Sequence, residues 1–409
     1  MKVKDTFLDA ASNTFLDKKV FSEMEPFMRE DFFGNSKSAH AFGVEASMAI
    51  EEAREEISHC LGFKKQEIIF TSGASEGNNC VIKALAYREL CKKPKKLQKK
   101  HIVCGATEHN SVLKPLQQLQ KLGFKVTFVK PNSKGVVTAD SVKEAITEDT
   151  FLLCLMAINN ELGTLNETSE ASYFAASHGV KTLVDCTQLL SYGSDSLHLP
   201  QQFPSADFFT FSAHKIYGPV GVGVLAVKED SLPLLQGNSL ILGGSQEGGI
   251  RGGTSNTAGI VGAAKAVSEM ELLDLKEHYE NLYRYTLNQL DTKIGHLNYK
   301  LNAIPFHKNI MSLCFYPYLN ENSLASTLSL YEIAVSAGSA CDAEHDETAG
   351  AFNPSHVLKS LDLTEPEIRN TIRISFDKKT STKSIDKLVT ALQEIKEGLI
   401  VVEGAKEDD

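Results

Sequence analysis

Cys341 lies in a sequence context that suits a reactive thiol. Residues 336–350 read S-A-G-S-A-C-D-A-E-H-D-E-T-A-G, so the cysteine lies between small residues and an acidic, polar run. Free thiols of soluble proteins are usually packed as small hydrophobes. Here the apolar segment Ile333 to Val335 predicts a short strand, and the residues after Cys341 predict a loop. A thiol on a loop can approach a substrate, and its thiolate is a strong nucleophile.

A lysine follows another predicted strand. Lys215 belongs to the turn S-A-H-K-I-Y-G-P after D-F-F-T-F (207–211), together with Ser212, His214 and Gly218. A lysine at a strand end is often simply solvated. In a dry pocket its pKa would fall from about 10.4, and the amine would become a nucleophile toward an aldehyde. Ser212 and His214 could then bind a phosphate carried by the same aldehyde.

Three further strand ends carry polar residues. Asp185 and Gln188 follow K-T-L-V-D, and a buried carboxylate there needs a partner such as a protonated pyridine nitrogen. A helix N-cap is the simpler alternative for Asp185. His109 comes from A-T-E-H-N-S-V, and Asn159 and Asn160 come from A-I-N-N-E-L-G. Alone, each would be an ordinary buried histidine or a pair of turn-forming asparagines.

Small residues open a predicted helix after E-I-I-F-T (67–71). The run S-G-A-S-E-G-N-N contains Gly73, Ser75 and Gly77, and backbone N–H groups at such a helix start bind phosphate. A tight turn is the alternative. Ligands of α/β sheets bind beyond the carboxyl ends of strands. A phosphate loop, an acid, a lysine and a histidine at such ends together describe a pyridoxal phosphate (PLP) site.

The elements that must position these residues alternate between strands and helices. Helical periodicity is clear in Val44 to Leu61. The predicted strands are 67–71, 101–105, 124–129, 151–156, 181–185, 207–211 and 222–227, and most are separated by helical segments such as 111–122 and 141–146. This order predicts an α/β fold with a mostly parallel sheet covered by helices on both faces.

The end of the chain has a different pattern. A long helical stretch is expected over Asn256 to Leu290, and N-I-M-S-L-C-F, A-V-S-A-G and T-I-R-I-S-F follow it with helices between them. We therefore expect a large domain over 15–260, and a smaller α+β domain formed by 1–14 and 261–409.

A set of motifs runs in a fixed order along nearly the whole chain. They are F-L-D-A-A-S-N-T, F-G-N, T-S-G-A-S-E-G-N-N, T-E-H-N-S-V, N-N-E-L-G, V-D-C-T-Q, S-A-H-K-I-Y-G-P, G-G-S-Q-E-G-G-I-R-G-G-T and I-R-I-S. In the order and spacing of these motifs, the chain resembles the NifS/IscS-type cysteine desulfurases, which are PLP-dependent members of the class V aminotransferase family. The resemblance implies a PLP-dependent transferase fold of type I.

The resemblance implies roles for the residues toward the cofactor. Lys215 binds the PLP aldehyde covalently, Asp185 pairs with the pyridinium nitrogen, and Gln188 contacts the ring hydroxyl. His109 stacks on the ring and assists proton transfer. The implied phosphate ligands are Ser75, Ser212 and His214, with Thr254 reaching in from a second subunit.

It also implies how the substrate reacts. Asn160, itself close to the cofactor, and Arg373 clamp the carboxylate of L-cysteine, and the arginine fork suits a carboxylate because it makes two parallel bonds. Cys341 is the family's mobile cysteine, which takes the sulfur as a persulfide and leaves L-alanine. A thiol with a pKa of about 8.5 is only slightly ionised at neutral pH, so His109 is expected to help. The family is homodimeric, with its active site near the subunit interface.

Three features depart from the family pattern. S-F-D-K-K follows Arg373 where the family usually continues S-x-G-R, and Ser75 replaces a threonine. The segment between Cys341 and Pro354 has twelve residues, which is long for the group. Its acidic residues and His345 could bind a metal with Cys341, but we interpret them as a solvated loop and predict no metal site. These differences bear on the choice of partner more than on the chemistry.

Composition excludes several classes of protein. A net charge of −10 and a pI near 5.7 disfavour a nucleic-acid-binding protein. The longest apolar run, Phe151 to Ile158, is too short to cross a membrane. Eight cysteines without a C-x-x-C pair, several of them in apolar runs, are typical of core thiols in a reducing compartment. With no recognisable targeting peptide, we expect a cytoplasmic protein.

Three functions compete on this pattern. A desulfurase would pass its sulfur to an acceptor or scaffold protein for iron–sulfur cluster assembly or tRNA thiolation. A relative with the same site would act on selenocysteine or cystine instead. A catalytically silent scaffold homologue is the third alternative, but it would have no need to keep Lys215, Asp185, His109 and Cys341 together.

Overall fold

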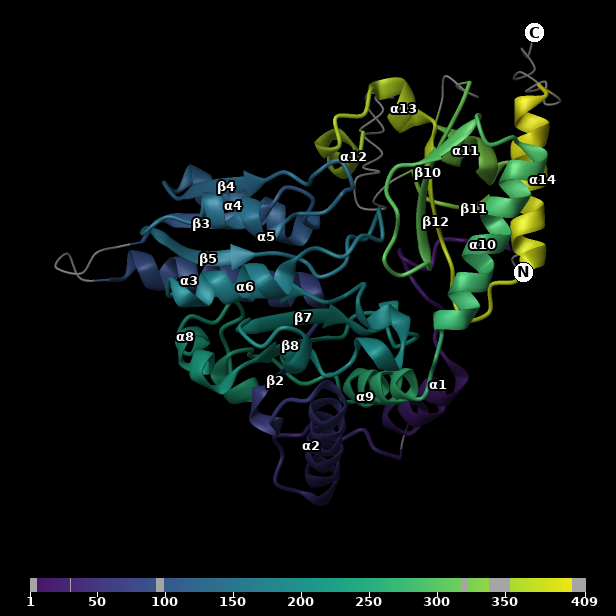
Figure 1. The fold of residues 1–409 in the computed structure, drawn as a ribbon. Coiled ribbons are helices and arrows are strands. Elements are labelled where there is room, and N and C mark those ends of the chain that lie inside the picture. Colours follow the sequence, from purple (N-terminus) through teal and green to yellow (C-terminus); the bar gives the residue numbers. More distant parts are fainter. Residues whose placement is uncertain (1–5, 30, 93–98, 318–322, 338–353, 399–409) are drawn as a thin grey trace, which may run out of the picture. The chain divides into compact units, whose positions relative to one another are not determined.

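The computed structural model describes residues 6–29, 31–92, 99–317, 323–337 and 354–398. These residues form two compact units, shown as a ribbon in Figure 1. The larger unit comprises residues Asn13–Asn160 and Thr164–Leu275. The smaller unit comprises the described parts of Met1–Ser12, Glu161–Gly163 and Lys276–Asp409.

Among the described residues of the larger unit, seven strands form one sheet in the order β2-β8-β7-β6-β5-β3-β4. The strands are β2 (Ile68–Thr71), β3 (His101–Gly105), β4 (Lys125–Val129), β5 (Thr150–Cys154), β6 (Lys181–Asp185), β7 (Phe208–Ser212) and β8 (Gly223–Val227). β8 pairs antiparallel with β2 and β7, whereas the other pairings are parallel. Figure 1 shows the strands side by side, and the predicted mostly parallel sheet is confirmed.

Helices cover both faces of this sheet because side chains alternate along each strand. On β3, Ile102 packs in a cluster with Val81 of α3 and Leu116 of α4, whereas its neighbour Val103 packs with Val142 of α5. The helices of this unit are α1 (Lys18–Met24), α2 (Ala41–Leu61), α3 (Ala74–Leu90), α4 (Asn110–Lys121), α5 (Ala139–Ala145), α6 (Thr168–Ser177), α7 (Leu199–Gln202), α8 (Leu232–Leu235) and α9 (Thr257–Glu271).

The smaller unit is an α+β arrangement. Its antiparallel sheet has the order β12-β10-β9, and a short parallel pair joins β1 to β11. The strands are β1 (Thr6–Phe7), β9 (Tyr299–Leu301), β10 (Ile310–Phe315), β11 (Ile333–Ala334) and β12 (Thr371–Ser375). The helices are α10 (Lys276–Lys293), α11 (Leu324–Ser329), α12 (His356–Ser360), α13 (Glu365–Arg369) and α14 (Thr382–Lys396). In the described part of the chain, no helix has the length and apolar character needed to cross a membrane.

The helical stretch expected over Asn256 to Leu290 consists of two helices, α9 and α10, with a break between Glu271 and Lys276. The interruption has a tertiary cause. The backbone N–H of Ser194 donates to the carbonyl of Leu273 at 3.0 Å. Gly193 has a φ of +99°, and a Cβ there would lie 2.3 Å from the same carbonyl oxygen, so the close approach requires glycine. Hydrophobic periodicity in the helix does not reveal such a distant contact.

Candidate active site

The carboxyl ends of β2, β3, β5, β6 and β7 lie at one edge of the sheet, because these strands run in the same direction. Ligands of α/β proteins bind at such an edge. The predicted residues at or just beyond these ends are Ser75, His109, Asn160, Asp185, Gln188, Ser212, His214 and Lys215. The fold therefore brings eight of the nine proposed cofactor residues to one edge of the larger unit, and the ninth is Thr254.

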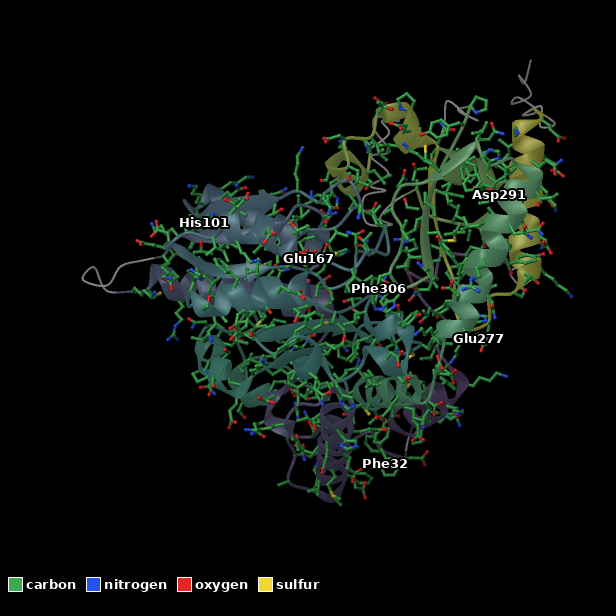
Figure 2. All side chains as sticks on the ribbon, viewed as in Figure 1. Phe32, His101, Glu167, Glu277, Asp291 and Phe306 are labelled. Carbon is green, nitrogen blue, oxygen red and sulfur yellow. The ribbon has the colours of Figure 1, made fainter. Side chains whose placement is uncertain are left out.

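The opposite edge also carries a buried histidine, but its environment is structural. Figure 2 shows His101 where β3 begins. Its Nδ1 lies 2.8 Å from Thr150 Oγ1, and its Nε2 lies 2.9 Å from Thr127 Oγ1. Because both ring nitrogens already bind threonine hydroxyls, we assign His101 no catalytic role.

The Asp185 carboxylate is buried at the end of β6 and held by two donors. Asn78 Nδ2 donates to its Oδ2 at 2.9 Å, and the backbone N–H of Thr187 donates to its Oδ1 at 3.0 Å. Thr210 Oγ1 fixes Asn78 by donating to its Oδ1 at 2.7 Å. The sequence reasoning missed Asn78, although it lies in the run S-G-A-S-E-G-N-N. Asn78 lies one turn into a helix that starts at a strand end, and this position could have predicted that it faces the site.

His109 caps the amino end of α4 and connects with Asp185 through two side chains. Its Nδ1 accepts a hydrogen bond from the backbone N–H of Ser111 at 3.1 Å and lies 2.8 Å from Ser111 Oγ. Asn78 Nδ2 also donates to Ser111 Oγ, at 3.0 Å. Since Nδ1 accepts from a backbone N–H, the hydrogen bonds assign the proton of the neutral ring to Nε2. The network orients the imidazole and sets its tautomer.

A second carboxyl group lies close to this network. Glu108 is almost fully buried, and its Oε1 accepts a hydrogen bond from the backbone N–H of Met156 at 2.8 Å. Burial, and to a smaller extent the charge of Asp185, raises the pKa of Glu108 well above its usual range. A protonated Glu108 adds no second negative charge beside Asp185.

The turn between β2 and α3 has the features of an anion cradle. Gly73 caps α3 with a φ of +155°, and the backbone N–H of Ala74 donates to Ser212 Oγ at 2.8 Å. His214 Nδ1 is buried and has no hydrogen-bond partner among the described residues. Burial, together with the charge of Lys215, lowers the pKa of His214 to about 4. A neutral imidazole with an unused buried nitrogen can donate to an anion.

Lys215 ends the short 3-10 helix Ala213–Lys215 that follows β7. Its turn is held by Thr14, whose Oγ1 donates to the His214 carbonyl at 2.8 Å and accepts from the Tyr217 N–H at 2.8 Å. Tyr217 has a φ of +65°, which is uncommon for a residue with a side chain. Thr14 ends the motif F-L-D-A-A-S-N-T, whose pattern alone does not predict this contact. Thr14 compensates for the strained turn.

Four other predicted residues of the larger unit differ in exposure. Gln188 is buried and Asn160 is half-buried at the same strand ends, whereas Ser75 and Thr254 are exposed. Asn159, the neighbour of Asn160, is fully buried and donates from Nδ2 to the Thr107 carbonyl at 3.0 Å. Asn159 is therefore a structural residue, which leaves Asn160 as the member of the pair able to meet a ligand.

Arg373 belongs to the smaller unit, where it lies almost fully buried in β12. Its Nη2 donates to Asp9 Oδ1 at 2.6 Å and to Ser336 Oγ at 3.0 Å. Ser336 Oγ in turn donates to Asp9 Oδ1 at 2.9 Å. Neither Asp9, which is 364 residues from Arg373, nor Ser336, which is 37 residues away, was predicted as a partner of Arg373. Together they orient the guanidinium group.

Cys341 and the acidic residues after it lie outside the described residues, as does the predicted loop that carries them. Of the described cysteines, Cys60, Cys80, Cys104, Cys154, Cys186 and Cys314 are buried free thiols. Cys91 is exposed at the end of α3, which corrects its interpretation as a core thiol. Cys91 begins the polar run C-K-K-P-K-K, and this context could have predicted its exposure.

The profile of the aminotransferase class-V family matches residues 6–388. This match spans nearly the whole chain and includes both units. The chain belongs to the aminotransferase class-V family.

Comparison with individual proteins shows which members of this family the chain is similar to. A cysteine desulfurase IscS from Dictyoglomus turgidum is 34% identical over 413 aligned positions, which cover 99% of this chain and 98% of that protein. A cysteine desulfurase IscS from Rickettsia prowazekii is 32% identical, with 93% and 88% covered. A solved NifS-like protein has a TM-score of 0.81 and 31% identity, with 97% and 99% covered. The predicted fold, the resemblance to NifS/IscS-type proteins and the class of enzyme are confirmed.

Proposed function

We propose that this chain is a cysteine desulfurase that uses PLP to convert L-cysteine to L-alanine and receives the sulfur as a persulfide on Cys341. The observation that carries the proposal is the buried Asp185 carboxylate, held by Asn78 at the strand ends that also carry His109 and Lys215. The full-length similarity to cysteine desulfurases supports the choice of substrate.

The strand-end residues fit PLP. The unused buried Nδ1 of His214 and the amino end of α3 suit its phosphate. The fixed carboxylate of Asp185 suits a protonated pyridine nitrogen, and the amine of Lys215 suits the aldehyde. When bound, the cofactor supplies an electron sink that labilises the Cβ–S bond of cysteine.

The chain's own residues bind the substrate, move the proton and accept the sulfur. We assign the substrate carboxylate to Arg373 and Asn160, and proton movement to Nε2 of His109. The Cys341 thiolate attacks the sulfur of cysteine, so that an S–S bond forms as the Cβ–S bond breaks. The electron pair from the broken bond stays with the carbon fragment, which takes up a proton and leaves as alanine.

A homodimer is part of this proposal. Several large apolar side chains around α1 and α2 are exposed, including Met28 (63%), Phe33 (66%) and Met48 (56%). Figure 2 shows Phe32 in the same region of the larger unit. An apolar patch of this kind is typical of a protein–protein interface, and exposed Thr254 would be available to a second subunit. Sedimentation as a single 44.8 kDa chain would contradict the dimer.

The sulfur acceptor and the compartment follow from the same chemistry. A persulfide is consumed by thiol exchange, so we propose an acceptor or scaffold protein that serves iron–sulfur cluster assembly or tRNA thiolation. Such exchange requires reduced thiols, and the described cysteines are free. We therefore propose the cytoplasm.

The test is incubation of the purified protein with L-cysteine, with alanine and sulfide measured in the presence and absence of dithiothreitol. We expect alanine in an amount that exceeds the enzyme, and sulfide release that depends on the reductant. Parallel reactions with selenocysteine and cystine distinguish the related lyases, which would prefer those substrates. A protein that binds no PLP and forms no alanine would be a silent scaffold.

Asp185→Asn is expected to retain PLP but to lose at least about a hundredfold in kcat. An amide cannot balance a protonated pyridine nitrogen, so the cofactor becomes a poorer electron sink. Alanine formation and the PLP absorbance should be measured on the same sample. Asp207→Asn is the matched control, because Asp207 is also a buried, multiply bonded aspartate of this unit. Near-normal turnover in Asp185→Asn would remove Asp185 from the mechanism.

Arg373→Lys is expected to lower kcat/KM for L-cysteine by about ten- to a hundredfold. Lysine keeps the charge but loses the planar fork that binds a carboxylate. Steady-state alanine formation gives the value, and Arg369→Lys, which changes a helix-surface arginine of the same unit, is the control. An unchanged kcat/KM in Arg373→Lys would assign the carboxylate to another residue.

A further inference from the structure

The first turn of α3 carries a carboxylate close to the proposed phosphate cradle. Glu76 directly follows Ser75, and its Oε2 accepts a hydrogen bond from the backbone N–H of Ser72 at 2.8 Å. This bond holds the turn between β2 and α3 in shape. A negative side chain also interacts favourably with the amino end of a helix. However, its charge would repel a phosphate bound at the same helix end.

Arg251 pairs with this carboxylate. Its Nε donates to Glu76 Oε1 at 3.0 Å, and the side chain of Glu76 is largely buried. Burial alone would raise the pKa of Glu76, but the hydrogen bonds from Ser72 and Arg251 outweigh it and hold the pKa below its usual range. Glu76 is therefore negatively charged at neutral pH, and Arg251 balances that charge.

The loop that carries Arg251 is fixed to the edge of the sheet. Glu247 accepts hydrogen bonds from Arg54 Nη1 at 2.7 Å, from Arg54 Nη2 at 2.9 Å and from the backbone N–H of Phe70 in β2 at 2.9 Å. Next to Arg251, the N–H of Gly252 donates to the Ile241 carbonyl at 2.9 Å. Arg251 is thus presented to Glu76 by an anchored loop.

We propose that Arg251 is a positioning residue for the cofactor phosphate, because it neutralises Glu76 while Glu76 holds the turn at Ser72. Glu76 then shapes the cradle without repelling the ligand. The inference rests on the proposed function for the identity of the anion. Arg251 acts through Glu76, and no direct contact between Arg251 and the phosphate is required.

A double-mutant cycle tests the charge argument. Arg251→Met should speed the release of PLP from the full-length protein by about tenfold, because it leaves the negative charge of Glu76 unbalanced. Glu76→Gln should not speed release, since the amide can still accept from Ser72 and the positive charge of Arg251 remains. Combining Glu76→Gln with Arg251→Met should bring release back to within about threefold of wild type.

Pyridoxal, which lacks the phosphate, separates electrostatics from general damage. Its affinity for the Arg251→Met protein should equal its affinity for the wild-type protein. Asp207→Asn, which removes a partly exposed ion pair where β6 and β7 begin, should leave PLP release unchanged. Melting temperatures should be measured for all variants to establish that each is folded at the assay temperature.

Different results would contradict the role of Arg251 and the proposed function. If the double variant releases PLP as fast as Arg251→Met, Arg251 acts on the phosphate directly and the inference is wrong. It is also wrong if Arg251→Met weakens pyridoxal and PLP equally, or retains PLP like the wild type. A wild-type protein that binds no PLP would instead overturn the proposed function.

Discussion

Cys341→Ser is expected to reduce alanine formation at least about a hundredfold while leaving cysteine binding intact. Sulfur transfer requires a soft, ionisable nucleophile, and a serine hydroxyl is not ionised near neutral pH. The residues assigned to the cofactor and to the substrate carboxylate are untouched by this change. L-cysteine should therefore still alter the PLP absorbance of the variant, although turnover stops.

Mass spectrometry of the wild-type protein gives an independent measurement. After exposure to L-cysteine, the Cys341 peptide should carry one added sulfur atom that dithiothreitol removes. Cys91 is the matched control, because it is the exposed member of the described cysteines. Cys91→Ser should keep full activity. Full activity of Cys341→Ser would reject the persulfide mechanism in favour of a lyase that releases its sulfur product directly.

Lys215→Ala is expected to abolish the covalent attachment of PLP and to reduce turnover by at least about a thousandfold. The amine is the group proposed to react with the aldehyde, and alanine offers no nucleophile. Borohydride should fix PLP on the Lys215 peptide of the wild-type protein and should fix none on the variant. Peptide mapping by mass spectrometry identifies the modified residue.

Lys215→Arg separates the nucleophile from the charge. Arginine retains the positive charge beside His214 but cannot react as an amine. We therefore expect Lys215→Arg to be as inactive as Lys215→Ala. PLP fixed on a different lysine of the wild-type protein would overturn the assignment of Lys215.

Local pattern determined the central sheet. Each predicted strand of the larger unit is present, because short apolar runs such as F-L-L-C-L-M are long enough for a strand buried on both faces but too short for a typical helix. The predicted site residues could be placed at one edge for the same reason, since parallel strands put their carboxyl ends together. Motif order then identified the family, which the profile match confirms.

Long-range contacts decided what the pattern could not show. The helical stretch over Asn256 to Leu290 breaks where Gly193 and Ser194 approach Leu273, although no glycine or proline marks the break in the sequence. Cys91 is exposed because its helix ends at a polar segment, whereas the other described cysteines lie inside packed elements.

Residue pattern is therefore enough to predict the residue types that could react and the sheet edge at which most of them lie. How those residues are held depends on contacts between distant parts of the chain. Asn78 bonds to Asp185, Thr14 closes the turn before Tyr217, and Asp9 orients Arg373. Periodicity and propensity act over a few residues, whereas a hydrogen bond between distant side chains depends on where packing brings their backbones.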